Sequence, residues 1–190
     1  TKFLRQGISY QLIEKKPLDY INNSKNNWDY YPTYTEYTNM MQAFADSFPE
    51  ICKLHHLGIL NSSREILILQ ISDNVGQKEN KPSFLYTSSM HGDELAGYIL
   101  SLRLVDYILN GYGNNPRLTD LVNEIDIWIN PLANPDGAYA GGNQDVWSAT
   151  RYNANWVDLN RNYPDPEDGP HPDGNAYQTE TNIFLGLADT

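Results

Sequence analysis

The stretch Ser83-Phe84-Leu85-Tyr86-Thr87-Ser88-Ser89-Met90-His91-Gly92-Asp93-Glu94 decides how this 190-residue chain is organised. Its first half, residues 83–88, predicts a buried strand. A helical pattern follows from about Glu94 to Asn110, with apolar residues recurring along one side. His91 and Glu94 therefore stand where a strand gives way to a helix, and open α/β sheets bind ligands at such strand ends.

Other strands and helices are predicted on both sides of this stretch. Thr33 and Glu36 have capping-box spacing and open a helical pattern that ends at Pro49. The further predicted elements, in chain order, are strands at 51–57 and 65–72, a short helix from Pro116, a strand at 125–132 and a helix at 179–188. The first two strands are joined by a connection of hairpin length and should pair antiparallel. The pattern predicts an α/β fold with a mixed parallel and antiparallel sheet and helices on both faces.

The predicted domain organisation is simple. Residues 1–32 carry no sustained period, and we interpret them as a lead segment on the domain surface. Residues 33–190 form one domain without internal repeats. The stretch from Ala133 to Ala176 has few signals for helix or strand, and loops of that length are usually functional or disordered.

Composition excludes some classes of partner. With 13 basic and 24 acidic residues, the net charge is -11, which opposes binding to a nucleic-acid backbone. No apolar run approaches the length of a membrane span. The single cysteine, Cys52, excludes an internal disulfide and is interpreted as a small apolar side chain of a strand, with a nucleophile as the less favoured alternative.

The chemistry of His91 and Glu94 matches part of a zinc site. Hydrolytic zinc takes three protein ligands of nitrogen and oxygen type and leaves one position for water, so this pair needs one more ligand. On its own the pair is a weak signal, because acidic residues at 93 and 94 would also complement a helix dipole without any metal. Three further motifs strengthen the metal hypothesis: Asn134-Pro135-Asp136-Gly137, Arg151, and Asp158-Leu159-Asn160-Arg161-Asn162-Tyr163-Pro164.

With these motifs in this order, the chain resembles the zinc metallocarboxypeptidase family, and most closely its regulatory branch, the carboxypeptidase E, N and D type. The matching segments are Met90 to Glu94, Asn134 to Gly137 and Asp158 to Asp165, with a weaker match at Ser62 to Glu65 and Ile71 to Asn74. The resemblance extends from about Tyr31 to Thr190 and covers the N-terminal part of the family's catalytic domain, so the C-terminal part of that fold is expected to be absent.

The resemblance implies a role for each of five residues. His91 and Glu94 would be two ligands of Zn²⁺. Arg151 would polarise the scissile carbonyl and hold the oxyanion, which suits a guanidinium because it stays charged and offers fixed donors. Asn160 and Arg161 would grip the C-terminal carboxylate of a peptide substrate, a group that a forked guanidinium binds through two parallel bonds.

The resemblance also implies that the site is incomplete. The family's second ligand histidine, its substrate-contacting tyrosine and its glutamate general base lie beyond the matching region. The other histidines, His55, His56 and His171, match none of these and are interpreted as structural or solvated. We therefore expect a continuation or companion chain to supply the third zinc ligand, and residues 1–190 alone to be inactive. Asp93 stands where relatives often carry Asn or Arg, which leaves the substrate preference open.

Three functions remain open at this point. The first is a zinc carboxypeptidase acting on the C-termini of peptides or proteins. The second is a peptide-binding module that keeps the scaffold and the carboxylate clamp without hydrolysis. The third is a zinc deacylase or a cell-wall peptidase on the same scaffold. The resemblance and the acidic balance suggest a secreted or periplasmic protein, and Asn134 to Gly137 is interpreted as a turn that shapes the floor of the site.

Overall fold

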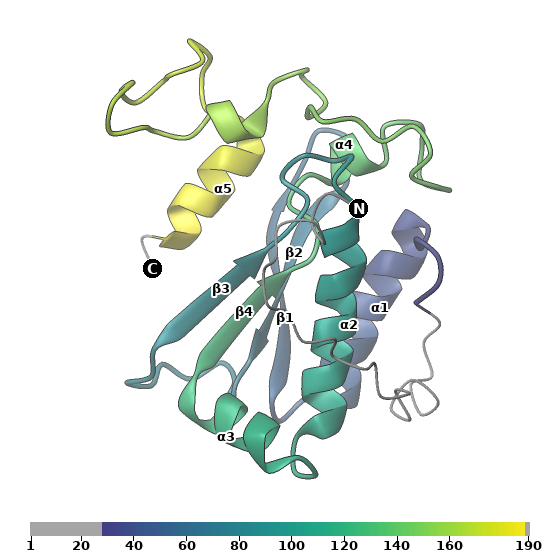
Figure 1. The fold of residues 1–190 in the computed structure, drawn as a ribbon, viewed down its shortest axis with the longest axis vertical. Helices are drawn as coiled ribbons and strands as arrows, with labels where there is room; N and C mark the ends of the chain where they lie inside the picture. The colour runs from purple at the N-terminus through teal and green to yellow at the C-terminus, as the bar shows by residue number, and fades with distance from the viewer. Residues whose placement is uncertain (1–27, 189–190) are drawn as a thin grey trace, which may run out of the picture.

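The computed structural model describes residues 28–188 and contains a four-stranded sheet in the order β1-β2-β4-β3 (Figure 1). The elements are α1 (Tyr34–Ser47), β1 (Cys52–Ile59), β2 (Glu65–Ile71), β3 (Ser83–Thr87), α2 (Ala96–Gly111), α3 (Pro116–Glu124), β4 (Asp126–Asn130), α4 (Pro135–Ala138), the 3₁₀ turn η3 (Leu159–Arg161) and α5 (Thr179–Ala188). Most of the predicted lead segment, residues 1–27, lies outside the described residues.

The predicted mixed sheet is confirmed. β1 and β2 form an antiparallel hairpin, β4 pairs antiparallel with β2, and β3 runs parallel to β4. The buried amide of Asn130 ties three strands together, because its Nδ2 donates to the carbonyl of Leu67 in β2 at 2.8 Å and its Oδ1 accepts from the hydroxyl of Thr87 in β3 at 2.8 Å. These bonds hold together the end of the sheet at which β3 and β4 finish.

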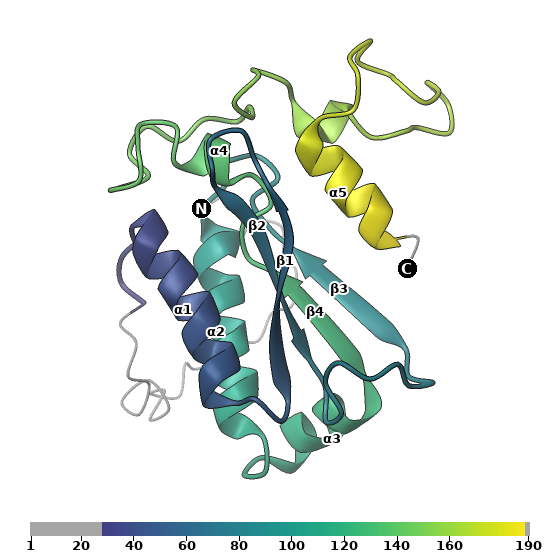
Figure 2. The same cartoon turned by 180° about the vertical axis from the view of Figure 1, so that it is seen from behind.

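Helices lie on both faces of the sheet. α1 and α2 cover one face, where Leu67, Leu69 and Ile129 pack into the main apolar core (Figure 2). On the opposite face, α5 lies close enough to β1 that a Cβ added at Gly58 would stand 2.5 Å from the Cδ1 of Ile183. The glycine therefore lets the helix approach the strand closely. None of the helices in residues 28–188 has the length and apolar character needed to cross a membrane.

The prediction that the strand at 83–88 is buried was wrong. Phe84, Leu85 and Tyr86 are 53%, 46% and 51% exposed. β3 is the edge strand, paired only with β4, and no helix of residues 28–188 packs extensively on either of its faces. An apolar pattern predicts that a strand is suited to burial, but it does not identify the segment that covers the strand. The other edge, β1, is better covered because α1 packs against it.

The predicted start of α1 is confirmed as a capping box. The hydroxyl of Thr33 accepts a bond from the backbone N–H of Glu36 at 3.1 Å, and a carboxylate oxygen of Glu36 accepts from the N–H of Thr33 at 2.8 Å. The buried residues Tyr37, Met41 and Phe44 then follow at helical spacing and join the core. The capping box fixes the register in which this apolar side begins.

Replacing Thr33 with alanine is expected to lower the free energy of unfolding by about 1 kcal/mol, because the N–H of Glu36 loses its acceptor. Thr35→Ala, at an exposed position one residue inside the same helix, is the matched control and should change stability by less than about 0.5 kcal/mol. Denaturant unfolding followed by circular dichroism measures both. Equal losses in the two variants would contradict the capping argument.

Candidate active site

The loop after β3 carries His91, and hydrogen bonds to neighbouring segments fix its path. Ser89 has a left-handed backbone, with φ of 54°, which turns the chain sharply at the strand end. Its hydroxyl donates to the carbonyl of Glu94 at 2.8 Å, closing the loop on itself. The side chain of Asn134 donates to the carbonyl of Met90 at 3.2 Å. His91 therefore projects from a restrained turn.

His91 and Glu94 face each other within this turn. The Nδ1 of the imidazole lies 3.1 Å from Oε1 of the carboxylate; the histidine side chain is 9% exposed and that of the glutamate 67%. The helix predicted from Glu94 begins instead at Ala96, with no acidic residue in its first turn. The structure thus does not support the alternative interpretation of these acidic residues as helix-capping groups.

Asp158 orients the imidazole from the other side. Its Oδ1 lies 3.1 Å from His91 Nε2, and its Oδ2 accepts a bond from Arg151 Nε at 3.0 Å. Burial raises the pKa of this carboxyl, but the bonds from Arg151, His91 and the N–H of Asn160 outweigh burial and lower the pKa below its ordinary value. An ionised Asp158 accepts a hydrogen bond from the N–H group at Nε2. The lone pair of Nδ1 then faces Glu94.

Arg151 provides a test of whether a metal fits between His91 and Glu94. Its Nη1 lies 3.2 Å from His91 Nδ1, and since a guanidinium only donates, Nδ1 must be an acceptor. The carboxylate of Glu94 is also an acceptor, so two lone pairs face each other at 3.1 Å with no proton between them. Two ligands of a tetrahedral zinc ion stand about 3.3 Å apart, given bonds of about 2.0–2.2 Å. Nδ1 and Oε1 therefore suit a zinc ion.

These two atoms supply only part of a zinc coordination sphere. Across residues 28–188, no group of three or more histidine, cysteine, aspartate or glutamate side chains could hold a metal ion. Asp158 contacts the imidazole nitrogen that faces away from Glu94, so it orients the ring and is not a ligand. The described part of the chain thus offers two ligands and one orienting carboxylate.

Asn160 and Arg161 stand on η3, the turn that Asp158 opens. Asp158 Oδ1 accepts from the backbone N–H of Asn160 at 3.0 Å, so the carboxylate that orients His91 also fixes this turn. Both side chains are exposed, and Arg161 Nη1 donates to the carbonyl of Asn160 at 2.9 Å. The remaining side-chain donors of Arg161 have no partner among the described residues. The structure thus leaves most of this guanidinium available for an anion.

Sequence reasoning missed the role of Arg64, which fixes the floor of the site. All three of its nitrogens are used: Nη1 pairs with Asp136 Oδ1 at 2.7 Å, Nη2 donates to the carbonyl of Tyr139 at 2.8 Å, and Nε donates to Asn143 Oδ1 at 2.9 Å. Asp136 is buried in α4, the turn predicted at Asn134 to Gly137. The hairpin of β1 and β2 is thereby joined to the long loop.

Two glycines allow the backbone segments of the site to pack closely. A Cβ added at Gly92, between His91 and Glu94, would stand 2.2 Å from the carbonyl carbon of Gly137 in α4. A Cβ added at Gly137 would in turn stand 2.5 Å from the carbonyl oxygen of Tyr152. Three backbone segments therefore stack in the order Gly92, Gly137, Tyr152, and side chains at the glycines would separate them.

The buried amide of Asn153 anchors the long loop to α5. Its Oδ1 accepts from the backbone N–H groups of Asn155 and Val157 at 3.0 and 3.1 Å. Its Nδ2 donates to the side chains of Gln178 and Glu180 at 3.1 and 3.3 Å. The loop from Ala133 to Ala176 contains little regular structure, as predicted, yet buried side chains hold this part of it in place.

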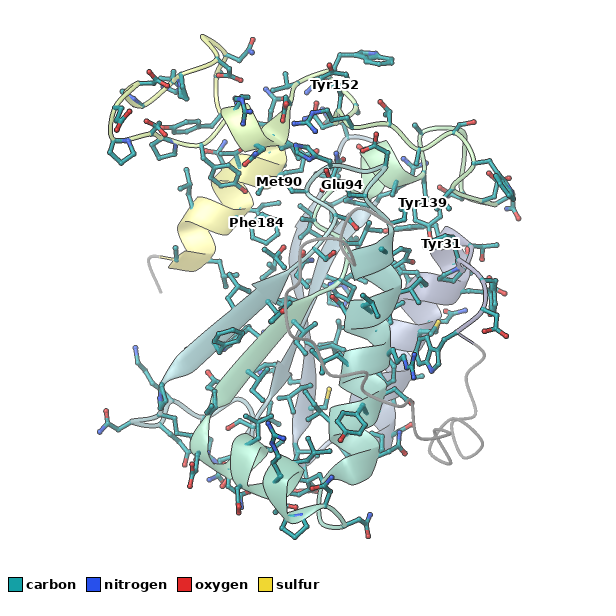
Figure 3. The ribbon with its side chains drawn as sticks, viewed as in Figure 1. Tyr31, Met90, Glu94, Tyr139, Tyr152 and Phe184 are labelled. Carbon is teal, nitrogen blue, oxygen red and sulfur yellow. The ribbon has the colours of Figure 1, made fainter. Side chains whose placement is uncertain are left out.

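A cavity of about 730 Å³ opens beside the candidate site. It lies between the end of β3 and the start of α2, and its lining includes Met90, Asp93 and Glu94. In Figure 3, Met90 and Glu94 lie at the end of the molecule where β3 and β4 finish. Glu94 thus borders both the cavity and His91, so a group entering the cavity can reach this carboxylate.

The structure gives other surroundings to the cysteine and to the three remaining histidines that the sequence analysis considered. Cys52 is buried in β1, and burial raises the pKa of its thiol to about 12, which keeps it protonated and supports the structural interpretation. His55 pairs with Gln70 on the neighbouring strand at 3.1 Å. His56 pairs with a glutamate of the same hairpin, and His171 stacks on a tyrosine of its own loop.

The sheet, the strand-end histidine and glutamate, and the orienting carboxylate together fit the class of zinc-dependent hydrolases with a site at the end of a mixed sheet. Comparison with known proteins narrows the class. A family model described as zinc carboxypeptidase matches residues 37–183, and the chain belongs to this family.

Relatives and solved structures agree with the family. Human carboxypeptidase D is 41% identical over 127 residues, which is 66% of this chain and 9% of that protein. The crystal structure of thrombin-activatable fibrinolysis inhibitor matches with a TM-score of 0.74 at 18% identity, over 87% of this chain and 45% of that chain. Carboxypeptidase A from Helicoverpa armigera matches with a TM-score of 0.67 at 24% identity, over 88% and 46%. At these identities the two solved structures show the fold alone. This chain spans less than half the length of each of the three matched proteins.

Gly92→Ala is expected to lower the free energy of unfolding by about 1–3 kcal/mol, because the new methyl group meets the backbone of α4. A zinc ion held by His91 and Glu94 should also be retained on the order of tenfold less well, since these two residues flank the displaced glycine. The matched control is Gly186→Ala in α5, where an added Cβ meets nothing within 4 Å. This control should gain about 0.5–1 kcal/mol. Thermal unfolding and zinc content after dialysis measure both variants, and a neutral Gly92→Ala would contradict the packing argument.

Glu180→Gln is expected to stabilise the protein at neutral pH. Burial raises the pKa of Glu180 above its ordinary 4.5, although bonds from the backbone and from Asn153 act in the opposite direction. A raised folded-state pKa means that the contribution of Glu180 to stability is fully present below pH 4.5 and is lost as the pH rises through the folded-state pKa. The glutamine variant keeps an acceptor for Asn153 and does not titrate. Its advantage, measured by urea unfolding at pH 4 and pH 7, should grow with pH; a constant difference would show that the carboxyl titrates normally.

Proposed function

We propose that this chain is the N-terminal part of a zinc-dependent metallocarboxypeptidase that hydrolyses the C-terminal peptide bond of peptides or proteins. The observation that carries the proposal is the pair of acceptor atoms, His91 Nδ1 and Glu94 Oε1, held 3.1 Å apart beside the guanidinium of Arg151. Membership of the zinc carboxypeptidase family supports it. Similarity to human carboxypeptidase D, whose name describes this activity, also supports it.

His91 and Glu94 are the residues that would hold the metal. Zinc, when bound, supplies a Lewis acid and lowers the pKa of a water molecule. Asp158 would keep the proton of His91 on Nε2, so that Nδ1 presents a lone pair to a metal. Arg151 holds a fixed positive charge within 3.2 Å of the same nitrogen, where it can donate to an oxygen that gains negative charge during hydrolysis.

Asn160 and Arg161 would bind the free carboxylate at the end of the substrate. The exposure of both side chains and the unused donors of Arg161 support this role. A guanidinium pairs with a carboxylate through two parallel hydrogen bonds, and the neighbouring amide adds a donor. Because only a chain end carries that carboxylate, this contact makes the proposed enzyme an exopeptidase.

The third zinc ligand and the general base would come from a continuation or companion chain. Two features of the described residues support this part of the proposal. The edge of β3 presents unpaired backbone groups and the exposed side chains of Phe84 and Tyr86, which suit an additional strand. The 730 Å³ cavity beside Glu94 is open to a side chain arriving from that direction. We further propose a secreted or periplasmic location, and no nucleic-acid partner, given the net charge of -11.

Two other functions use the same geometry. The presence of only two metal ligands in residues 28–188 favours a peptide-binding module that keeps the clamp of Asn160 and Arg161. Such a module would bind peptides equally well after treatment with a chelator. A zinc deacylase or cell-wall peptidase would instead require zinc and prefer N-acylated amino acids or cell-wall peptides over ordinary peptides.

Arg161→Ala in the full-length protein is expected to reduce kcat/KM for release of a C-terminal amino acid roughly 10- to 100-fold, because a charge-assisted hydrogen bond to the substrate is lost. Arg117→Ala is the matched control: it removes an exposed arginine from α3, at the opposite end of the sheet (Figure 1). Amino-acid release from peptides with free and amidated C-termini, with and without chelator, measures the effect. Equal rates of amino-acid release from the free and the amidated peptides would contradict the exopeptidase assignment. Peptide binding without any amino-acid release would favour the peptide-binding module.

A further inference from the structure

Two aromatic side chains near the candidate site are exposed to solvent. Trp156 is 74% exposed and Tyr152 is 37% exposed, and their ring centroids lie 5.9 Å apart at an interplanar angle of 46°. Burial of a tryptophan ring removes a large apolar area from water, so a tryptophan this exposed gives up much of its contribution to folding. We refer to Tyr152 and Trp156 as the aromatic pair.

The backbone holds the aromatic pair in place. Trp156 has a left-handed conformation with φ of 59°, which a bulky residue rarely adopts. Reciprocal bonds close the turn around it: the N–H of Trp156 donates to the carbonyl of Asn153 at 3.0 Å, and the N–H of Asn153 donates to that of Val157 at 3.1 Å. The buried side chain of Asn153 anchors this turn to α5. The exposed rings therefore stand on a rigid support.

The aromatic pair is also contiguous with the candidate active site. Arg151 directly precedes Tyr152, and Asp158 follows Trp156 by two residues; both Arg151 and Asp158 contact His91. The backbone of Tyr152 packs on Gly137, which packs on Gly92 in the turn of His91. Figure 3 shows Tyr152 at the same end of the molecule as Met90 and Glu94. Arg161, the proposed binding residue for the end of a peptide, follows Trp156 by five residues in the same loop.

The surroundings indicate which side chain the rings would bind. Ring faces attract cations, but at a solvent-exposed pair such as this one water weakens that attraction. An anionic side chain gains little from a ring face. An aromatic side chain gains area burial together with tilted ring contacts. The chemistry therefore favours an aromatic residue.

We propose that Tyr152 and Trp156 form a subsite for an aromatic side chain of the substrate, at a residue on the N-terminal side of the scissile bond. The inference rests on the proposed function, because it assumes a peptide held by its C-terminal end. Tyr152 and Trp156 act as specificity-determining residues: they bind a part of the substrate that does not react, and they take no part in the bond cleavage.

The test is equilibrium binding by calorimetry to the full-length protein, after chelator treatment so that no turnover occurs. The probes are acetylated tetra-alanine and three derivatives, each with one phenylalanine at a different position before the last residue. Wild-type protein should bind the best phenylalanine peptide about 5-fold more tightly than the all-alanine peptide. The preference should disappear in Trp156→Gly and in Tyr152→Ala, and remain in Trp156→Phe. Trp147→Ala, which removes a tryptophan that is 92% exposed, is the matched control and should keep it.

The outcomes separate this inference from the proposed function. Glycine suits a positive φ, so Trp156→Gly should unfold no earlier than wild type in a thermal melt, and a lost preference then reflects the missing ring. The subsite is overturned if wild type shows no preference for phenylalanine or if Trp156→Gly and Tyr152→Ala both retain it. Amino-acid release by the zinc-loaded protein is measured separately. If the phenylalanine preference holds without such release, the proposed hydrolysis fails and the aromatic subsite stands.

Discussion

The hydrogen bond between Asp158 and His91 Nε2 is the interaction on which the candidate site depends. It joins the turn after β3 to the 3₁₀ turn η3, which is 67 residues further along the chain. By fixing the proton on one ring nitrogen it makes the other an acceptor, and the same carboxylate holds Arg151 and the N–H of Asn160. One carboxyl group thus positions the imidazole that we propose binds the metal, the guanidinium that we propose binds the oxyanion, and the turn that carries the proposed substrate clamp.

Buried polar side chains in the long loop support that interaction. The long loop has almost no helix or strand, so its shape is set by buried polar side chains: Asp136 paired with Arg64, Asn153 bonded to α5, and Asn134 bonded to the turn of His91. Each of these side chains is buried and hydrogen-bonded, which makes any displacement costly. The hairpin, α4 and α5 are therefore held together through the loop as well as through direct contacts such as that between Gly58 and Ile183.

Much of the fold was predictable from sequence because its signals are local. The capping box at Thr33, the hairpin of β1 and β2 and the helix at Thr179–Ala188 follow from spacing within a few residues, and the structure confirms them. The exposure of β3 was not predictable, because coverage of a strand depends on which distant segment packs on it. The bond of Asp158 to His91 and the pairing of Arg64 with Asp136 were missed for the same reason: each joins residues more than sixty positions apart, and no pattern within one segment encodes such a contact.

The exposed edge of β3 has a consequence for the behaviour of this polypeptide in the cell and in the test tube. A strand that offers its backbone donors and acceptors together with aromatic side chains pairs readily with any extended chain, including another copy of itself. Phe84 and Tyr86, with ring centroids 5.7 Å apart, would reinforce such pairing. Residues 28–188 on their own are thus expected to form intermolecular sheets as the concentration rises.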